Sequence, residues 1–265
     1  DQLLFVMLRR VLDFGSRQSS LSRALIMGPG TCYTPNNIVV TQKRNLFRPQ
    51  KHRFNEEKHD CLEPFMSEKS FERHFETVYL EGYKKLNTLV QGTPYLDFSE
   101  IHRVVHLSAG HQGDIEIFNA AADIRNHQIF FDTLVPWDYT NAEKALSKNT
   151  RRELYVQFGG LEMFKLEFMR QAKEFRGSGW LWLINRDSHL EIMATHNNAT
   201  PEVLDERIVP IFCLDLWEHS FVDDYGANIE AYVDSFWHVL NWETVEERCM
   251  FARRMMLFLT DRSES

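Results

Sequence analysis

Two side chains that can bind a metal follow an apolar run late in the sequence. Asp215 and His219 lie four residues apart in DLWEH, directly after IVPIFCL. Further histidines fall on other expected elements, His74 on one long helix and His127 on the next. Three imidazoles and one carboxylate suit iron, manganese or zinc and leave room for a solvent ligand. The chain has 11 histidines, however, and each taken alone is more typical of a surface position or a hydrogen-bonded core position than of a metal ligand.

The elements that must position these side chains follow from hydrophobic spacing. From Ser67 onward, aromatic and aliphatic residues recur every three or four positions, which predicts a helix. Later stretches of the same kind predict helices over about 114–134, 150–174, 226–241 and 243–258. Between them, the pattern becomes typical of strands in WLWLIN, HLEIMAT and RIVPIFCLDL. The predicted class is α+β, with a helical half followed by a smaller antiparallel α/β half.

The length and composition limit the class of protein. A chain of 265 residues can form one large domain or two small ones. No apolar run approaches the roughly 20 residues that span a bilayer, so no membrane partner is expected. The four cysteines lie far apart and form no CxxC pair, which is typical of reduced thiols in an intracellular compartment.

Charge is distributed unevenly along the chain. Residues 1–60 hold ten Lys and Arg against five Asp and Glu, whereas the remainder holds 20 against 33. The first 26 residues combine Arg, Ser and amphipathic spacing, as organelle-import segments do, although an ordinary amphipathic helix has the same pattern. Residues 28–60 lack periodicity and predict an extended basic arm that partner molecules hold. Candidate RNA-phosphate contacts in this arm are Arg44, Arg48, Lys51, Arg53 and Lys58.

Several motifs, in order along the chain, resemble the iron/manganese superoxide dismutase family. They are LEPFMSEKSFERHFETVYLEGYKKLN at 62–87, FNAAADIRNHQIFF at 118–131, GSGWLWL at 177–183, MATHNNATP at 193–201, DLWEH at 215–219 and YVDSFWHVLNWETV at 232–245. The resemblance covers about three quarters of the chain. It implies a helical hairpin domain over 61–145 and an α/β domain with a three-stranded antiparallel sheet over 146–265, after a basic extension over 1–60.

The resemblance also implies a metal site and a dimer. His74, His127, Asp215 and His219 would hold one iron or manganese ion, with iron favoured, and a solvent molecule would be the fifth ligand. Glu218 of each subunit would bond His219 of its partner, which would be a second copy or a related superoxide dismutase-like chain.

The residues around the ligands depart from the family pattern. The family carries a histidine four residues after its first ligand and a tyrosine four further on, where this chain has Val78 and Gly82. A tyrosine of the partner subunit is replaced by Val222. The glutamine that tunes the bound solvent is missing from both places where the family puts it, and Asp123 and Asn198 stand there. These changes remove the polar groups that would deliver protons, so no catalytic residue is expected around the ligands.

Three functions remain open from the sequence, and the least favoured is an isolated metal-binding or partner-regulating protein. The favoured one is a superoxide dismutase-like structural component of the small subunit of the mitochondrial ribosome, without efficient dismutase activity. Its partners would be ribosomal proteins and, through the basic arm, ribosomal RNA, in the mitochondrial matrix. The alternative is an active mitochondrial iron superoxide dismutase, which the complete ligand set supports.

Overall fold

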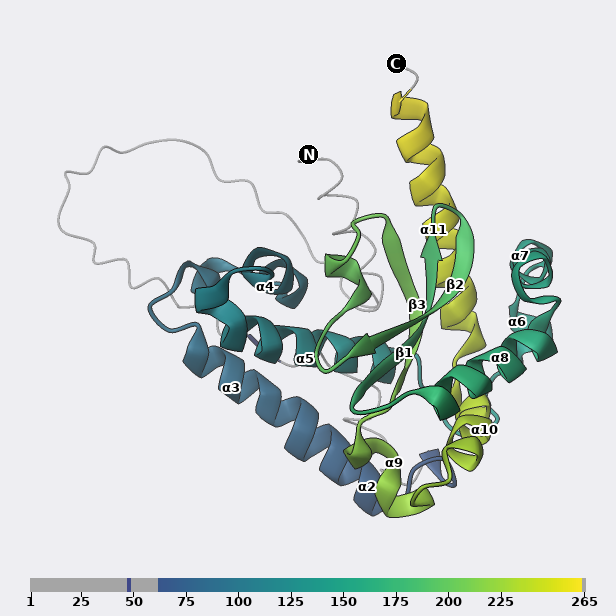
Figure 1. The fold of residues 1–265 in the computed structure, drawn as a ribbon, viewed down its shortest axis with the longest axis horizontal. Coiled ribbons are helices and arrows are strands. Elements are labelled where there is room, and N and C mark those ends of the chain that lie inside the picture. Colours follow the sequence, from purple (N-terminus) through teal and green to yellow (C-terminus); the bar gives the residue numbers. More distant parts are fainter. Residues whose placement is uncertain (1–46, 49–61, 264–265) are drawn as a thin grey trace, which may run out of the picture. The chain divides into compact units, whose positions relative to one another are not determined.

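The computed structural model describes residues 47–48 and 62–263, and a helical half comes first (Figure 1). Its helices are α2 (Glu68–Glu72), the π-helix η3 (Arg73–Leu80), α3 (Glu81–Leu89), η4 (Pro94–Asp97), α4 (Ile101–Ser108), η5 (Gln112–Asp114) and α5 (Ile115–Asp132). Three helices lead into the second half, α6 (Ala142–Ala145), α7 (Lys148–Phe158) and α8 (Leu161–Glu174). The second half continues with β1 (Gly179–Arg186), β2 (His189–His196), η6 (Pro201–Val203), β3 (Ile208–Asp215), α9 (Glu218–Tyr225), α10 (Ile229–Val239) and α11 (Trp242–Ser263).

The long helix expected after Ser67 forms, but part of it is wound as a π-helix. The Ser67 hydroxyl caps the helix by accepting from the Ser70 N–H at 3.3 Å. Residues Arg73–Leu80 then form η3, in which hydrogen bonds join residue i to i+5, and α-helix resumes in α3. Hydrophobic periodicity does not distinguish this local change of winding from an uninterrupted α-helix.

The single helix expected over about 150–174 is wrong, because two glycines divide it. Gly159 and Gly160 have φ angles of +87° and +124°, which a residue with a side chain rarely adopts. The Gly159 N–H donates to Tyr155 O at 2.9 Å and ends α7, and α8 begins at Leu161. The glycine pair therefore marks the end of α7 and separates it from α8.

The expected three-stranded antiparallel sheet is confirmed, with the order β2-β1-β3. Trp180 of β1 pairs with Thr195 of β2 on one side and with Asp215 of β3 on the other. The central strand is buried along nearly its whole length. Helices α5 and α11 both pack against β3. The sheet therefore fixes the end of β3, where Asp215 lies, between the two halves of the fold.

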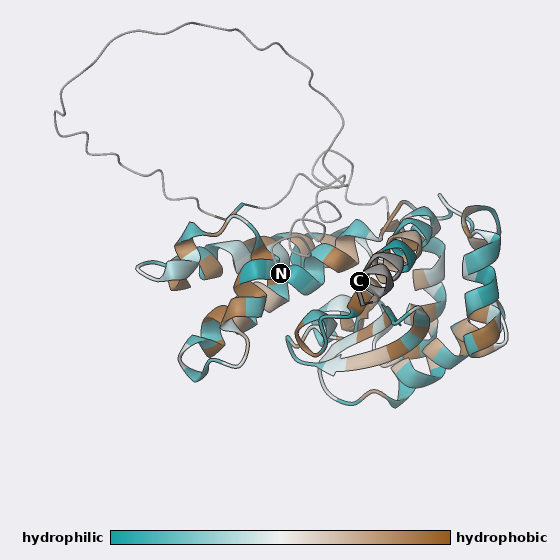
Figure 2. Cartoon of the chain, turned by 90° about the horizontal axis from the view of Figure 1, so that it is seen from above, coloured by the Kyte–Doolittle hydropathy of each residue, from teal (hydrophilic) through white to brown (hydrophobic). Residues whose placement is uncertain are grey.

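The core is continuous across the described residues from both halves. Hydrophobic segments follow the strands, while the helices alternate between hydrophobic and hydrophilic faces (Figure 2). Among the described residues, Cys213 and Cys249 are buried free thiols, and Cys32 and Cys61 lie outside that part of the chain. Within residues 62–263, no helix combines the length and the apolar character needed to cross a membrane.

The extended arm expected over about 28–60 lies outside the described residues, apart from Phe47 and Arg48. Phe47 is buried, and the Asn87 amide both accepts from its N–H and donates to its C=O, each at 2.8 Å. This chain itself therefore holds the segment at Phe47. Arg48 is exposed. The other four candidate RNA contacts (Arg44, Lys51, Arg53 and Lys58) fall outside the described part, and the domain boundaries at residues 60 and 145 stay predictions.

Candidate metal centre

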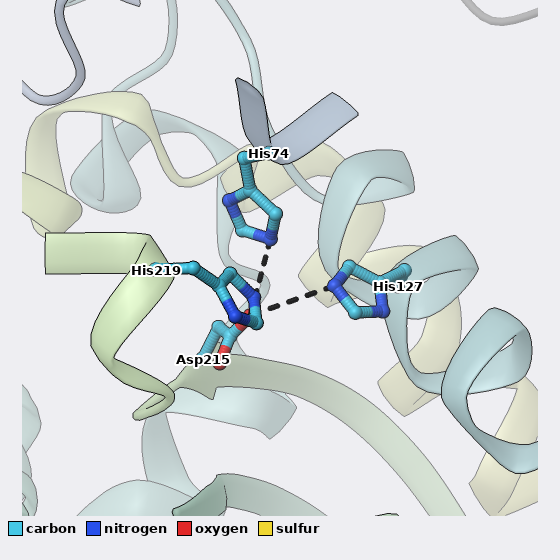
Figure 3. Close-up of side chains that lie close together, drawn as sticks. All are labelled: His74, His127, Asp215 and His219. Carbon is cyan, nitrogen blue, oxygen red and sulfur yellow. Dashed lines mark hydrogen bonds and ion pairs between the residues drawn. The ribbon is translucent and has the colours of Figure 1, made fainter. Parts of the chain in front are cut away.

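Four elements bring the four predicted ligands to one point (Figure 3). His74 comes from η3 and His127 from α5, while Asp215 ends β3 and His219 lies in the first turn of α9. Asp215 Oδ2 is 3.1 Å from the Nε2 of His74, 3.2 Å from that of His219 and 3.7 Å from that of His127. One potential ligand atom from each residue lies within 4.8 Å of all the others. Side chains separated by up to 145 positions therefore converge as a metal site requires.

The buried imidazoles have nitrogen atoms without hydrogen-bond partners. His74, His127 and Asp215 are fully buried, and the His219 side chain is 16% exposed. Within the described part of the chain, Nδ1 of His74 and Nε2 of His127 make no hydrogen bond, and Nε2 of His74 has only the Asp215 carboxylate beside it, at 3.1 Å. A buried polar atom left unpaired costs about 1–3 kcal/mol. Coordination of a cation by Nε2 would offset that cost, so the donor set fits a metal ion.

Neighbouring groups orient two of the ligands. His127 Nδ1 donates to the backbone oxygen of Asp123 at 2.8 Å, which places the proton on Nδ1 and leaves the lone pair on Nε2. Asp215 Oδ1 accepts from the Trp217 N–H at 2.8 Å, so Oδ2 is the oxygen that faces the histidines. Tyr232 also donates to the backbone oxygen of Asp215 at 3.0 Å. The hydrogen bonds to His127 Nδ1 and Asp215 Oδ1 thus orient His127 Nε2 and Asp215 Oδ2 toward the centre of the cluster.

The electrostatics of the cluster favour a cation. Burial lowers the pKa of His74 to about 3, so its ring is neutral at pH 7. Burial acts to raise the pKa of Asp215, but His219 and His74 outweigh burial and hold it well below its ordinary value. Burial likewise acts to lower the pKa of His219, and the Asp215 carboxylate reverses that effect and raises it. The cluster offers an ionised carboxylate and at least one neutral imidazole at neutral pH, and a metal would have to displace a proton shared between Asp215 and His219.

Three altered positions, on η3, α3 and α9, carry no group that could relay a proton to this cluster. Val78 is half-buried on η3, and Val222 is 44% exposed on α9. A Cβ atom on Gly82 would lie 3.2 Å from Ile124 Cγ1 and 3.9 Å from Asp123 Oδ2, so the glycine leaves a narrow space beside α5. None of these three side chains has an exchangeable proton.

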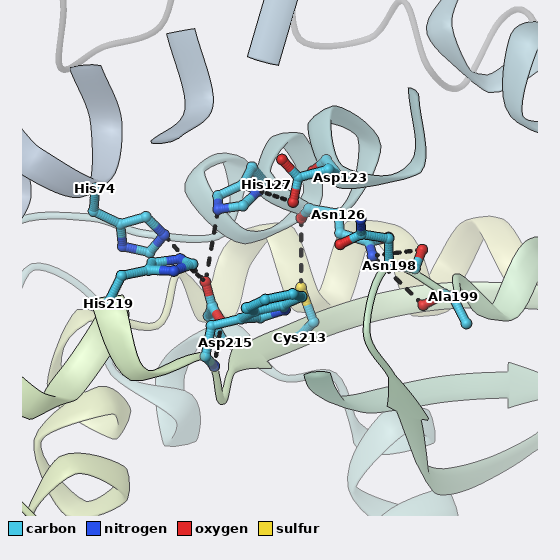
Figure 4. A network of polar contacts seen from close by, with 10 residues as sticks. His74, Asp123, Asn126, His127, Asn198, Ala199, Cys213, Asp215 and His219 are labelled. Carbon is cyan, nitrogen blue, oxygen red and sulfur yellow. Dashed lines mark hydrogen bonds and ion pairs between the residues drawn. The ribbon is translucent and has the colours of Figure 1, made fainter. Parts of the chain in front are cut away.

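Two polar residues flank the His127 side of the site (Figure 4). Asp123 Oδ1 lies 3.5 Å from His127 Nδ1, and burial raises the pKa of this carboxyl. Asn198 is half-buried, and its backbone oxygen accepts from Asn126 at 3.4 Å. Within the described chain, the side-chain oxygen of Asn198 makes no hydrogen bond. Asp123 therefore places a carboxylate where the family has a neutral amide.

Sequence reasoning missed a set of buried polar groups near His127. Gln128 donates to the Tyr83 hydroxyl at 2.9 Å, and the hydroxyls of Tyr83 and Tyr79 are 3.2 Å apart. The spacing of the two tyrosines, four residues apart, was the available signal. Their connection to α5 depends on packing between helices, which the sequence does not show. Glu218 is exposed at the start of α9, and its bridge to a partner subunit stays a prediction.

Comparison with known proteins shows similarity across both halves. Residues 146–248 match the family described as iron/manganese superoxide dismutases, C-terminal domain. A protein from Entamoeba histolytica (strain ATCC 30459 / HM-1:IMSS / ABRM), named superoxide dismutase [Fe], is 32% identical over 190 residues, which cover 72% of this chain and 94% of that relative. An alignment of this length is longer than residues 146–265, so it also includes the helical half.

Proposed function

Because the chain belongs to the iron/manganese superoxide dismutase family, we propose that it binds one iron or manganese ion, with iron favoured, and converts superoxide to oxygen and hydrogen peroxide. The observation that carries this proposal is the convergence of three imidazole Nε2 atoms on Asp215 Oδ2 in a buried site. A redox-active metal held by these four residues would supply the one-electron chemistry that dismutation of superoxide requires.

The protein's own residues hold the site and control its surroundings. His74, His127, Asp215 and His219 would be the ligands. The Asp123 backbone oxygen keeps the proton of His127 on Nδ1, and the Trp217 N–H keeps Oδ1 of Asp215 occupied. The aromatic rings packed around the histidines exclude water from the sides of the site.

Proton supply is the weak point of this chemistry. Two superoxide ions need two protons to give one molecule each of oxygen and hydrogen peroxide. Val78, Gly82 and Val222 offer none, so protons must come from solvent that enters the site. When Asp123 is ionised, its charge beside His127 would favour the oxidised ion and oppose the approach of an anion, whereas burial raises the pKa of this carboxyl. We therefore expect metal-dependent dismutation in which the reduction of superoxide to hydrogen peroxide, the half-reaction that needs protons, is slow.

The direct test is reconstitution of the purified protein with Fe²⁺ or Mn²⁺. The wild-type protein is expected to hold about one ion per chain and to consume superoxide in proportion to its metal content. His127→Ala is the matched control, since it removes one ligand and leaves the other three. A loaded wild-type protein that consumes superoxide no faster than this control would contradict the proposal.

A second candidate function is supported by the altered positions and by the charge of residues 1–60. A protein that keeps its fold but has Val78, Gly82 and Val222 in place of the family's proton carriers is compatible with a structural role in the small subunit of the mitochondrial ribosome. Basic side chains at the N-terminal segment would contact ribosomal RNA in a salt-sensitive way. The test is sedimentation of native mitochondrial extracts. This candidate requires the protein to migrate with the small subunit, and migration only as a free protein would exclude it.

We also propose a dimer with a second copy or a related chain through the surface around α9. Glu218 is exposed there, and His219 is the most accessible of the four ligands. The Glu218 carboxylate of one subunit could therefore reach the His219 ring of the other, and this hydrogen bond would fix the orientation of the ring.

A further inference from the structure

Three buried polar side chains form a hydrogen-bond chain next to the metal centre. Gln128 Nε2 donates to the Tyr83 hydroxyl at 2.9 Å, and the Tyr83 and Tyr79 hydroxyls share a hydrogen bond of 3.2 Å. Tyr79 is 3% exposed, Tyr83 2% and Gln128 9%. These three residues are called the Tyr–Tyr–Gln chain below. Buried hydrogen bonds of this kind fix the groups that make them, because breaking one leaves unpaired polar atoms in the core.

The Tyr–Tyr–Gln chain joins the two helical segments that carry His74 and His127. Tyr79 lies on η3 with His74, Tyr83 lies on α3, and Gln128 follows His127 directly on α5. The bond from Gln128 to Tyr83 therefore connects α5 with the continuous helix formed by η3 and α3. Any sliding of one helix past the other would break this bond and would separate the two histidines.

The aromatic ring of Tyr79 extends this connection to the ligands. Its centroid lies 6.1 Å from that of His127 at an interplanar angle of 25°, an offset parallel arrangement. Tyr79 and His74 also pack against the same ring, that of Phe131, at 5.4 and 5.1 Å. The helix segment η3, which carries both His74 and Tyr79, is wound as a π-helix.

The tyrosines are suited to hold positions and unsuited to supply protons. Burial raises the pKa of Tyr79 far above its ordinary value. Burial also raises the pKa of Tyr83. Both phenols therefore remain neutral at physiological pH, and their hydroxyls act as hydrogen-bonding groups.

We propose that Tyr83 is a positioning residue of the metal centre, acting through Gln128 and Tyr79 to keep the Nε2 atoms of His74 and His127 aimed at one cation. The inference rests on the proposed metal site and adds residues that lie outside its four ligands. Partners behind metal ligands commonly change metal affinity 10- to 100-fold when removed. Tyr83 is one step further from the metal, so its effect falls at the lower end of that range.

The test compares Tyr83→Phe with Tyr95→Phe. The first substitution removes the hydroxyl and keeps the ring. The second removes another buried hydroxyl, which donates to Asp114 at 2.7 Å. This hydroxyl makes no hydrogen bond to the four ligands or to Tyr79 and Tyr83. Tyr83→Phe is expected to lower the affinity for Mn²⁺ about tenfold and to change the electron paramagnetic resonance spectrum of the bound ion. Tyr95→Phe is expected to lower the melting temperature and leave both of these unchanged.

A double variant separates positioning from stability. Tyr83→Phe alone leaves both the Gln128 amide and the Tyr79 hydroxyl without their partner. Tyr83→Phe with Gln128→Leu also removes the amide, so that only the Tyr79 hydroxyl stays unpaired. The double variant is expected to recover part of the lost melting temperature without recovering Mn²⁺ affinity. Recovery of both, or an unchanged affinity and spectrum in Tyr83→Phe, would overturn the positioning role.

Failure of the proposed function would be recognised separately. If the wild-type protein binds neither Fe²⁺ nor Mn²⁺, the proposed metal centre is wrong. The positioning of the rings is then measured in the metal-free protein from the ¹⁵N resonances of the His74 and His127 side chains. Tyr83→Phe is expected to shift both sets of resonances, Tyr95→Phe neither. Unshifted resonances in Tyr83→Phe would overturn the positioning role in that case as well.

Discussion

His74, His127 and Asp215 are completely buried, with ligand atoms aimed at one point, whereas the altered positions carry only the methyl groups of Val78 and Val222 and no side chain at Gly82. The two regions serve different steps of the proposed chemistry. The ligands hold a cation, and the surrounding positions would bring protons to the reacting oxygen. Binding and turnover can therefore be altered separately in this protein, and substitutions in each region test that separation.

The largest effect is expected from loss of a ligand. Asp215→Asn removes the carboxylate charge on which all three Nε2 atoms converge. We expect the purified variant to contain almost no iron or manganese, because the remaining ligands are neutral. Elemental analysis gives the metal content, and circular dichroism shows whether the variant has folded. A folded Asp215→Asn protein with full metal content would show that the cluster is not the metal site.

The second-largest effect is expected from substitutions at the altered positions. Val78→His, Gly82→Tyr, Asp123→Gln and Val222→Tyr together restore the proton-carrying groups of the family pattern. Positioned proton donors contribute about 100-fold or more, so superoxide turnover per bound metal is expected to rise by about that factor. Because the position of a new Cβ at residue 82 lies 3.2 Å from Ile124 Cγ1, the same set should be made with Ile124→Val. Stopped-flow kinetics measures the rate of superoxide consumption. Equal turnover per bound metal in the wild type and the four-substitution variant would show that proton supply does not limit the reaction.

A third prediction asks whether lower stability alone empties the site. Arg125 of α5 makes two bonds to Glu202 of η6, at 2.7 and 3.0 Å, and both side chains are largely buried. Removing one partner of such a pair costs about 3 kcal/mol of unfolding free energy. Glu202→Gln is expected to show this loss in urea titrations while the folded fraction keeps its metal. Loss of metal from the folded variant would show that the ligands depend on this distant contact.

The same pair predicts a pH dependence with a definite sign. Burial acts to raise the pKa of Glu202, but Arg125 outweighs burial and lowers it below the ordinary value of 4.5. The ionised form is thus stabilised by folding. Its contribution is complete above the pKa of the unfolded chain and is lost as the pH falls through the lowered pKa of the folded protein. Glu202→Gln should therefore flatten the acid side of the stability profile, and a profile identical in shape to the wild type would contradict this assignment.

The smallest effect concerns the proposed subunit bridge. Glu218→Ala would leave the His219 ring of the partner without a hydrogen bond and weaken the dimer by about 1–3 kcal/mol. Analytical ultracentrifugation measures the dissociation constant. Glu230→Ala serves as the control, since its exposed contact to Lys173 lies on other helices. An unchanged constant in Glu218→Ala, or an equal change in both variants, would exclude this interface.

Much of the fold and the ligand set could be predicted from the sequence because their signals are local or come from ordered motifs. Apolar strands separated by a short turn indicate a hairpin, and DLWEH places two ligands at the end of a strand. The helix break at Gly159 was missed because apolar spacing continues on both sides of it. The winding of η3 and the bond from Gln128 to Tyr83 were missed for a different reason. Both depend on how two helices pack, and neither residue type nor spacing specifies that contact.

The separation of metal binding from turnover is tested most directly by titrating metal-free wild-type protein and the four-substitution variant with Mn²⁺ in a calorimeter. The proposed site predicts about one ion per chain in both proteins and similar affinities, since Val78, Gly82 and Val222 are not ligands and Asp123 contributes to His127 through its backbone oxygen. Absence of binding in the wild type, with binding appearing only after the four substitutions, would contradict it.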